Sequence, residues 1–176
     1  MKQNLETKRL QLQQMKDEDA ATLFTIWSDP IVTKHMNISS FKTVNQATEM
    51  IRHLTKLADD KQAIRYSINL RQSAVIIGSC GFNQIDFTNK KAEIGYELAY
   101  EHWGYGYAQE AINCLTNYGF KELDLNRMEA KVAPENASSI KLLQRLAFTY
   151  EGTLRQAEKY DGVFHDLALY SKLAAD

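Results

Sequence analysis

Apolar and polar positions alternate at the start of the chain and then change to helical spacing. Leu10 and Leu12 stand between polar residues, which is typical of a half-buried strand. A helix is predicted next, with Asp17 as its cap and Asp29-Pro30 as its end. The apolar residues that would bury this helix are Ala20, Leu23, Phe24 and Trp27.

The remaining elements follow from the same change of period. Thr43 and Gln46 form a capping-box pattern at the start of a second helix. We then expect strands at 66–70, 75–82 and 92–98, a helix from about Gly106, a strand at 128–132, a helix at 137–146 and two closing strands. This order predicts an α+β fold with one mixed, mostly antiparallel sheet and helices on both faces. No linker interrupts the 176 residues, so one domain spanning 1–176 is expected.

The segment 102–108, His-Trp-Gly-Tyr-Gly-Tyr-Ala, joins a strand-like stretch to a helix. Gly104, Gly106 and the small Ala108 would let an anion approach the backbone closely. The first N–H groups of a helix have no partner inside it, and the helix dipole is positive there. The turn therefore predicts a phosphate or pyrophosphate site; the alternative is a tight turn that binds nothing.

Two common phosphate motifs do not fit this turn. A dinucleotide-binding turn would need a third glycine where Gln109 stands, and the Gly-Lys-Ser/Thr ending of nucleotide hydrolases is absent. The pattern Gln/Arg-x-x-Gly-x-Gly/Ala fits from 103 to 108, although Trp103 stands at its first position. This is the acyl-CoA pyrophosphate motif of the GNAT superfamily of N-acyltransferases, which the chain resembles.

The resemblance covers nearly the whole chain and is strongest from Ile94 to Ser171. The run from His102 to Ala111 resembles the branch that acetylates the N-termini of ribosomal proteins, in which a tryptophan at this point is ordinary. Further matching segments are 7–12, 126–130, 134–140, 146–148, 151–155 and 165–171. The resemblance implies the GNAT fold, acetyl-CoA as cofactor, and direct attack of a primary amine, such as a protein N-terminal α-amine, in a ternary complex. Acetylation of a small amine (polyamine or antibiotic) and a non-catalytic CoA-binding sensor or scaffold remain alternatives.

The resemblance also assigns residues to the cofactor. Leu98 matches the strand end whose free backbone edge pairs with the pantetheine arm, and its N–H would polarise the thioester carbonyl. The cofactor contacts expected at the glycine turn are Trp103, Gly104, Tyr105, Gly106, Tyr107 and Ala108.

Asn136 and Ser139 stand at the start of the second cofactor-contacting helix. Asn136 is also a good cap for that helix, which is the plainer interpretation. Many relatives place a tyrosine seven residues after this asparagine to protonate the leaving thiolate, but here the position is Leu143. Ser139, with or without a water molecule, is therefore the candidate acid.

A base must take a proton from the acceptor ammonium. Glu129 and then Glu93 are the preferred candidates, acting through water, and Glu97 is also conceivable. The alternative for each is a solvated or ion-paired carboxylate. Cys80 and Cys114 lie in apolar segments and are expected to be inert, which favours direct transfer.

The acceptor side has weaker signals. The candidates to line an acceptor pocket are Trp27, His35, Met36 and Phe41, which are as easily core residues. Asp166 could orient the amine or be structural.

Composition narrows the partners. A net charge of −1 gives no basic field for nucleic acid, and 44% hydrophobic with 24% charged residues is ordinary for a globular protein. Two cysteines make neither a disulfide framework nor a metal set. Without an 18-residue apolar run or a signal-peptide pattern, we expect a cytoplasmic protein with no membrane partner. Whether it forms a homodimer stays open.

Overall fold

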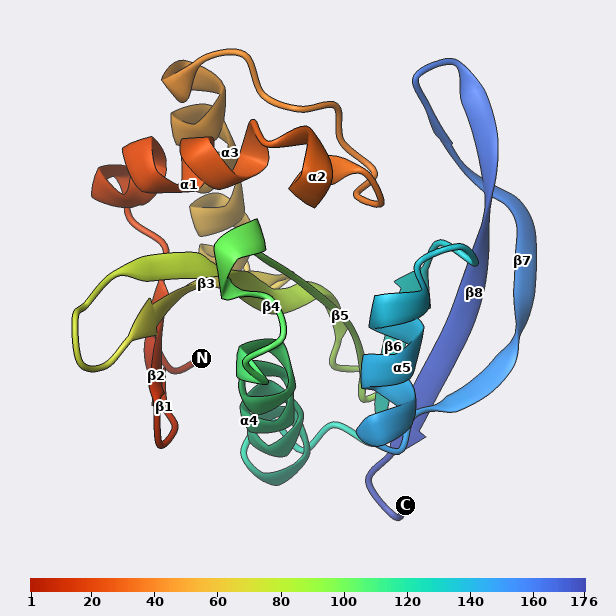
Figure 1. Ribbon diagram of the computed structural model, residues 1–176. Coiled ribbons are helices and arrows are strands. Elements are labelled where there is room, and N and C mark those ends of the chain that lie inside the picture. Colours follow the sequence, from red (N-terminus) through yellow and green to blue (C-terminus); the bar gives the residue numbers. More distant parts are fainter.

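The computed structural model describes residues 1–176, and its centre is one eight-stranded sheet. The strand order is β1-β2-β3-β4-β5-β6-β8-β7, and every neighbouring pair is antiparallel except β5 and β6 (Figure 1). The strands are β1 Asn4–Glu6, β2 Leu10–Gln14, β3 Ile64–Leu70, β4 Ile76–Asp86, β5 Lys91–Leu98, β6 Arg127–Val132, β7 Thr149–Tyr160 and β8 Val163–Leu173.

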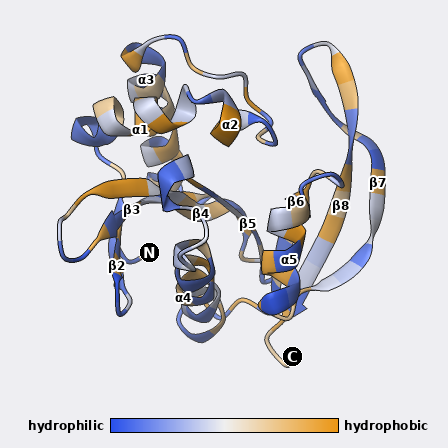
Figure 2. Ribbon diagram, in the orientation of Figure 1, coloured by the Kyte–Doolittle hydropathy of each residue, from blue (hydrophilic) through white to orange (hydrophobic).

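Helices cover both faces of this sheet. In Figure 1, α1 to α3 lie on one side of β3 to β5, and α4 lies on the other. The helices are α1 Ala20–Trp27, α2 Pro30–Thr33, α3 Val44–Asp59, α4 Tyr107–Lys121 and α5 Ala137–Arg145. The larger apolar core joins α4 and α5 to the strands, and a smaller one lies under α1 and α3. In Figure 2, hydrophobic stretches follow β3, β4 and β8 into these cores. The predicted fold class is confirmed.

The sheet opens in its middle, between β5 and β6. These two strands pair only from Lys91 to Glu93, opposite Arg127 to Glu129. Beyond Glu93, β5 continues to Leu98 with a free edge on that side. Figure 1 shows the two strands diverging, with α4 and α5 on the two sides of the gap. The fold therefore leaves unpaired strand backbone beside two helix N-termini.

Most predicted elements are confirmed, with local differences near the N-terminus. The segment 7–12 resembles the opening strand of the family, but its residues 7–9 form the turn between β1 and β2. Asp17 does not cap α1: it begins a single 3₁₀ turn, Asp17–Asp19, and the Asp19 carboxylate accepts the Lys16 N–H at 3.1 Å. The capping box of Thr43 and Gln46 is present. No helix is long and apolar enough to cross a membrane.

Candidate active site

The glycine turn takes the backbone shape that an anion site requires. Gly104 and Gly106 have φ angles of +82° and +78°, in the left-handed region that only glycine enters easily. The first bond of α4 runs from the Glu110 N–H to the Gly106 carbonyl, at 3.1 Å. The N–H groups of residues 107–109 thus have no acceptor within the helix. A Cβ at Gly104 would meet no atom within 4 Å, so the space in front of the turn is open.

Arg9, from the turn before β2, braces this segment. Its Nη1 donates to the Tyr105 carbonyl at 2.9 Å, and its guanidinium lies 4.5 Å from the centre of the Tyr107 ring. Its Nε also pairs with Glu110 at 2.6 Å. Partial burial raises the pKa of Glu110, but hydrogen bonds from Thr7 and Arg9 outweigh this and hold it below its usual value. The carboxylate in the first turn of α4 is therefore neutralised by Arg9 and does not face the anion site as a free charge.

A cavity of about 640 Å³ lies in front of the turn, within the opening of the sheet. Of the predicted cofactor contacts, those that line it are Leu98, Trp103, Gly104, Gly106, Tyr107, Ala108, Asn136 and Ser139. Tyr105 does not line the cavity, and its side chain is exposed. The lining also carries the cations Lys34, Lys141 and Arg145, which the sequence reasoning missed, against the single carboxylate of Glu97. Such a lining favours a polyanionic ligand.

The end of β5 offers its backbone to this cavity. The Ala99 N–H bonds to the Ile77 carbonyl at 2.8 Å, and Leu98 stands opposite Gly78 in the ladder. Because antiparallel pairs alternate, the backbone groups of Leu98 and Tyr96 point away from β4 and into the opening. The Trp103 indole donates to the Leu98 carbonyl at 2.8 Å. The Leu98 N–H therefore makes no bond to β4 and faces the opening, and its contact with the cofactor stays a prediction.

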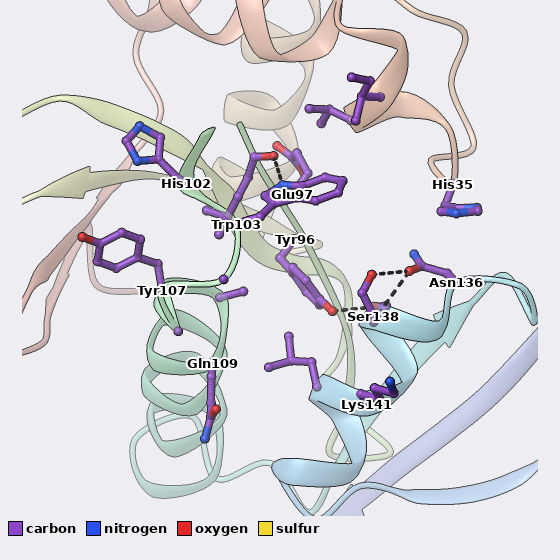
Figure 3. Close-up of a pocket in the computed structure, with 18 of the residues that line it drawn as sticks. His35, Tyr96, Glu97, His102, Trp103, Tyr107, Gln109, Asn136, Ser138 and Lys141 are labelled. Atoms are coloured by element: carbon purple, nitrogen blue, oxygen red, sulfur yellow. Dashed lines mark hydrogen bonds between the residues drawn. The ribbon is translucent and has the colours of Figure 1, made fainter. Parts of the chain in front are cut away.

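On the opposite side of the cavity, Asn136 and Ser139 begin α5. The Asn136 side chain accepts the Ser139 N–H at 3.2 Å and the Ser138 hydroxyl at 3.0 Å, so it caps the helix. The Ser139 hydroxyl lies 2.5 Å from the phenol oxygen of Tyr96. Figure 3 shows that phenol pointing from β5 toward the first turn of α5. Leu143, where a tyrosine was sought, is a buried core residue.

Tyr96 was not among the candidates from sequence, although one signal pointed to it. Alternation along β5 places Tyr96 on the same face as Leu98. The sequence could not show that this face meets Ser139, because α5 lies some forty residues further along the chain. The phenol in the cavity is therefore a tertiary feature.

The two preferred bases lie outside this cavity. Glu93 pairs with Lys131 at 2.7 Å, and Glu129 pairs with Arg127 at 2.8 Å. The two carboxylates stand opposite each other on β5 and β6, where the strands still pair. Neither lines the cavity, and the ion-paired interpretation describes both. A catalytic role for them stays a prediction.

Glu97, the third carboxylate considered, lines the cavity and belongs to a buried polar network. Its side chain accepts hydrogen bonds from Arg65 and Ser79, and from the Trp27 indole at 2.9 Å. The network joins α1 to β3, β4 and β5. A buried carboxylate that is paired in this way is stable only while its partners remain.

Neither cysteine lies in the cavity lining. Cys80 is fully buried in β4, and burial raises the pKa of its thiol. Cys114 is half-buried in α4, and burial raises its thiol pKa as well. Both thiols are thus kept in the unreactive protonated form.

A smaller cavity of about 280 Å³ adjoins the main one, and His35 lines both. It is formed by the segment after α2, the loop between β6 and α5, and the tip of the β7–β8 hairpin. Three carboxylates line it, those of Glu135, Glu158 and Asp166. No lysine or arginine is among its lining residues. Asp166 also accepts the Gln156 N–H at 2.7 Å, a structural role.

Of the four residues considered for an acceptor pocket, two line the main cavity. These are His35 and Met36. Trp27 and Phe41 instead meet edge to face, with ring centres 5.6 Å apart, and belong to the smaller core.

Comparison with known proteins agrees with this geometry. The sequence pattern of the family described as "Acetyltransferase (GNAT) domain" matches residues 9–149. A Bacillus licheniformis protein, "Uncharacterized N-acetyltransferase p20", is 50% identical over 171 residues, which is 97% of this chain and 96% of that protein. The Escherichia coli ribosomal-protein-serine acetyltransferase is 35% identical over 98 residues, 56% of this chain and 55% of its own length. The solved structure of RimL, a ribosomal L7/L12 alpha-N-protein acetyltransferase in complex with coenzyme A, has a TM-score of 0.87 at 23% identity, covering 98% of this chain and 99% of that one.

An open sheet with a glycine turn and free backbone donors defines an enzyme that binds an acyl-CoA thioester. The chain belongs to the GNAT acetyltransferase family and is an N-acetyltransferase that uses acetyl-CoA. The prediction of family, fold and cofactor made from the sequence is confirmed.

Proposed function

We propose that this enzyme transfers the acetyl group to the N-terminal α-amine of a polypeptide, by direct attack of the amine on acetyl-CoA. The observation that carries the proposal is the smaller cavity, which shares the lining residue His35 with the main one and so adjoins it. An acceptor whose amine reaches the thioester can extend into this space, as a peptide chain does. The match to the Escherichia coli ribosomal-protein-serine acetyltransferase supports the same acceptor class.

The cofactor side would act as follows. The turn at Gly104 and Gly106 holds the pyrophosphate with backbone N–H groups. The Leu98 N–H bonds to the thioester carbonyl and stabilises the oxyanion that develops there, an effect worth roughly 3 kcal/mol of barrier. The amine then displaces the thiolate in one ternary complex, without an acyl-cysteine.

A small polyamine is the second candidate acceptor, and the acidic lining of the smaller cavity favours it. Glu135, Glu158 and Asp166 would attract a chain of ammonium groups as well as the basic residues of a peptide. Both candidate acceptors are therefore extended and cationic. They differ in whether they contain peptide bonds.

The test is thiol release from acetyl-CoA in the presence of matched amines. The panel holds basic peptides that begin with Ser, Ala or Met, the same peptides with a blocked N-terminus, and spermidine. Acetylation of the free peptides but not of the blocked ones, located by mass spectrometry at the α-amine, is the expected result. Turnover of spermidine alone would replace the peptide by the polyamine, and tight acetyl-CoA binding with no turnover of any amine would favour a sensor.

A further inference from the structure

The hydroxyl groups of Tyr96 and Ser139 form an isolated pair in the cavity of the cofactor. Their oxygens lie 2.5 Å apart, and neither hydroxyl has another hydrogen-bond partner in the protein. Both residues line the main cavity, from β5 and from the first turn of α5. Two hydroxyls carry two protons, and one of these is used in the bond between them. The other is free to be donated to a ligand.

We propose that Tyr96 is the source of the proton that neutralises the departing thiolate, and that the Ser139 hydroxyl passes this proton on. This rests on the proposed direct transfer. A serine hydroxyl can accept one hydrogen bond and donate another at the same time, which suits a relay. Of the two hydroxyls, the phenol is the stronger acid, since its ordinary pKa is about 10, so it holds the resulting negative charge at lower cost than a serine alkoxide would.

The transfer balances without any further reactant. When the tetrahedral intermediate collapses, the carbon–sulfur bond breaks and its electron pair stays on sulfur. Sulfur takes the Ser139 proton, and the Ser139 oxygen takes the Tyr96 proton. The acceptor ammonium loses two protons to solvent, one before it attacks and one as the amide nitrogen forms. The tyrosinate regains one proton from solvent, so one proton is released overall.

The surroundings of Tyr96 keep the donor loaded. Burial raises the pKa of Tyr96 to about 12, more than the bond to Ser139 lowers it. The phenol is therefore protonated over the whole range in which the protein is expected to work. Because it acts through Ser139, Tyr96 is a positioning residue.

The first test is a double-mutant cycle with Tyr96→Phe and Ser139→Ala. Each change should lower kcat roughly a hundredfold, the usual size of an acid contribution, with the KM for acetyl-CoA within about twofold. Because both residues act on one proton, the double variant should be no slower than either single one. The control is Tyr150→Phe, which removes a similar phenol–hydroxyl bond, to Thr153 at 2.8 Å, on the exposed β7 strand. It should leave kcat unchanged.

A second measurement separates proton donation from packing. Replacing Tyr96 by a more acidic fluorinated tyrosine should give kcat a new fall at alkaline pH, because an ionised phenol has no proton to give. A phenol that only supports Ser139 by packing would leave the pH profile unchanged. Full activity of Tyr96→Phe, or additive losses in the cycle, would overturn the proposal.

These tests do not depend on the acceptor. They use whichever amine of the panel is acetylated, and in parallel the slow hydrolysis of acetyl-CoA without any amine, since both reactions release the same thiol. If peptides fail but another amine succeeds, the proposed acceptor is wrong while the role of Tyr96 is still decided.

Discussion

The two cavities of this enzyme are built in opposite ways. The cofactor cavity depends on backbone: a glycine turn, a helix N-terminus and a free strand edge, with cationic side chains such as Lys141 and Arg145 around them. The acceptor cavity depends on side chains from three segments far apart in sequence, and its charges are carboxylates. The first suits acetyl-CoA, the cofactor that the family shares. If the second receives the acceptor, as proposed, it must differ wherever the acceptor differs, and loops and hairpin tips change more easily than sheet backbone.

The largest effect is expected when the same substitution, glycine to glutamate, is placed once in the glycine turn and once in the β7–β8 hairpin. Gly106→Glu should weaken acetyl-CoA binding on the order of a hundredfold or more, because a carboxylate at the turn repels the pyrophosphate. Its φ of +78° adds strain of about 1–2 kcal/mol. Isothermal titration calorimetry with acetyl-CoA measures the loss.

The matched control is Gly162→Glu at the tip of the β7–β8 hairpin. Its φ is +77°, and a Cβ there would meet no atom within 4 Å. The strain is therefore similar, but the affinity for acetyl-CoA should not change. Equal affinities of the two variants would mean that the glycine turn is only structural.

The acceptor cavity can be probed by removing one of its charges. Glu135→Gln should raise the KM of a cationic acceptor by up to about fivefold, the upper limit given by one exposed ion pair of about 0.2–1 kcal/mol. The KM of acetyl-CoA should stay the same. Steady-state kinetics at low and high salt test this, because salt screening should remove the difference in acceptor KM between the variant and the unchanged enzyme. Glu18→Gln, an exposed carboxylate outside both cavities, is the control, and a change in the KM of acetyl-CoA would contradict the division into halves.

The smallest effect is expected next to the cofactor half, at the end of α5. Ala147 has a φ of +60°, where a glycine would be relaxed. Ala147→Gly should raise the free energy of unfolding by about 0.5–1 kcal/mol, after allowance for the more flexible unfolded chain. Urea unfolding tests it against Ala21→Gly, an exposed site in the first turn of α1, which should lower stability by up to about 1 kcal/mol. A loss of stability in both variants would show that the strain at Ala147 is negligible.

The same contrast explains how far the sequence could predict the molecule. The glycine turn was recognisable because Gly104 and Gly106 favour a left-handed backbone conformation locally, and the structure has that conformation. Leu98 was assigned by resemblance to the family, and its role stays a prediction. The partner of Ser139, by contrast, was invisible, because nothing near Ser139 in sequence points to Tyr96 on another element. Local propensity also gave an incorrect cap at Asp17, where the carboxylate two residues later binds the backbone instead.

The bond between Trp27 and Glu97 has a consequence for anyone who would graft a new acceptor segment onto this scaffold. Trp27 ends α1, just before the α2 region that lines the main cavity, and its indole satisfies a carboxylate on the strand that serves the cofactor. Exchanging α1 and α2 for those of another transferase would remove that donor unless the tryptophan is carried along. Leaving the buried Glu97 carboxylate without this donor would cost about 1–3 kcal/mol of stability. A chimera should therefore be cut after Trp27, so that the recipient keeps its own indole.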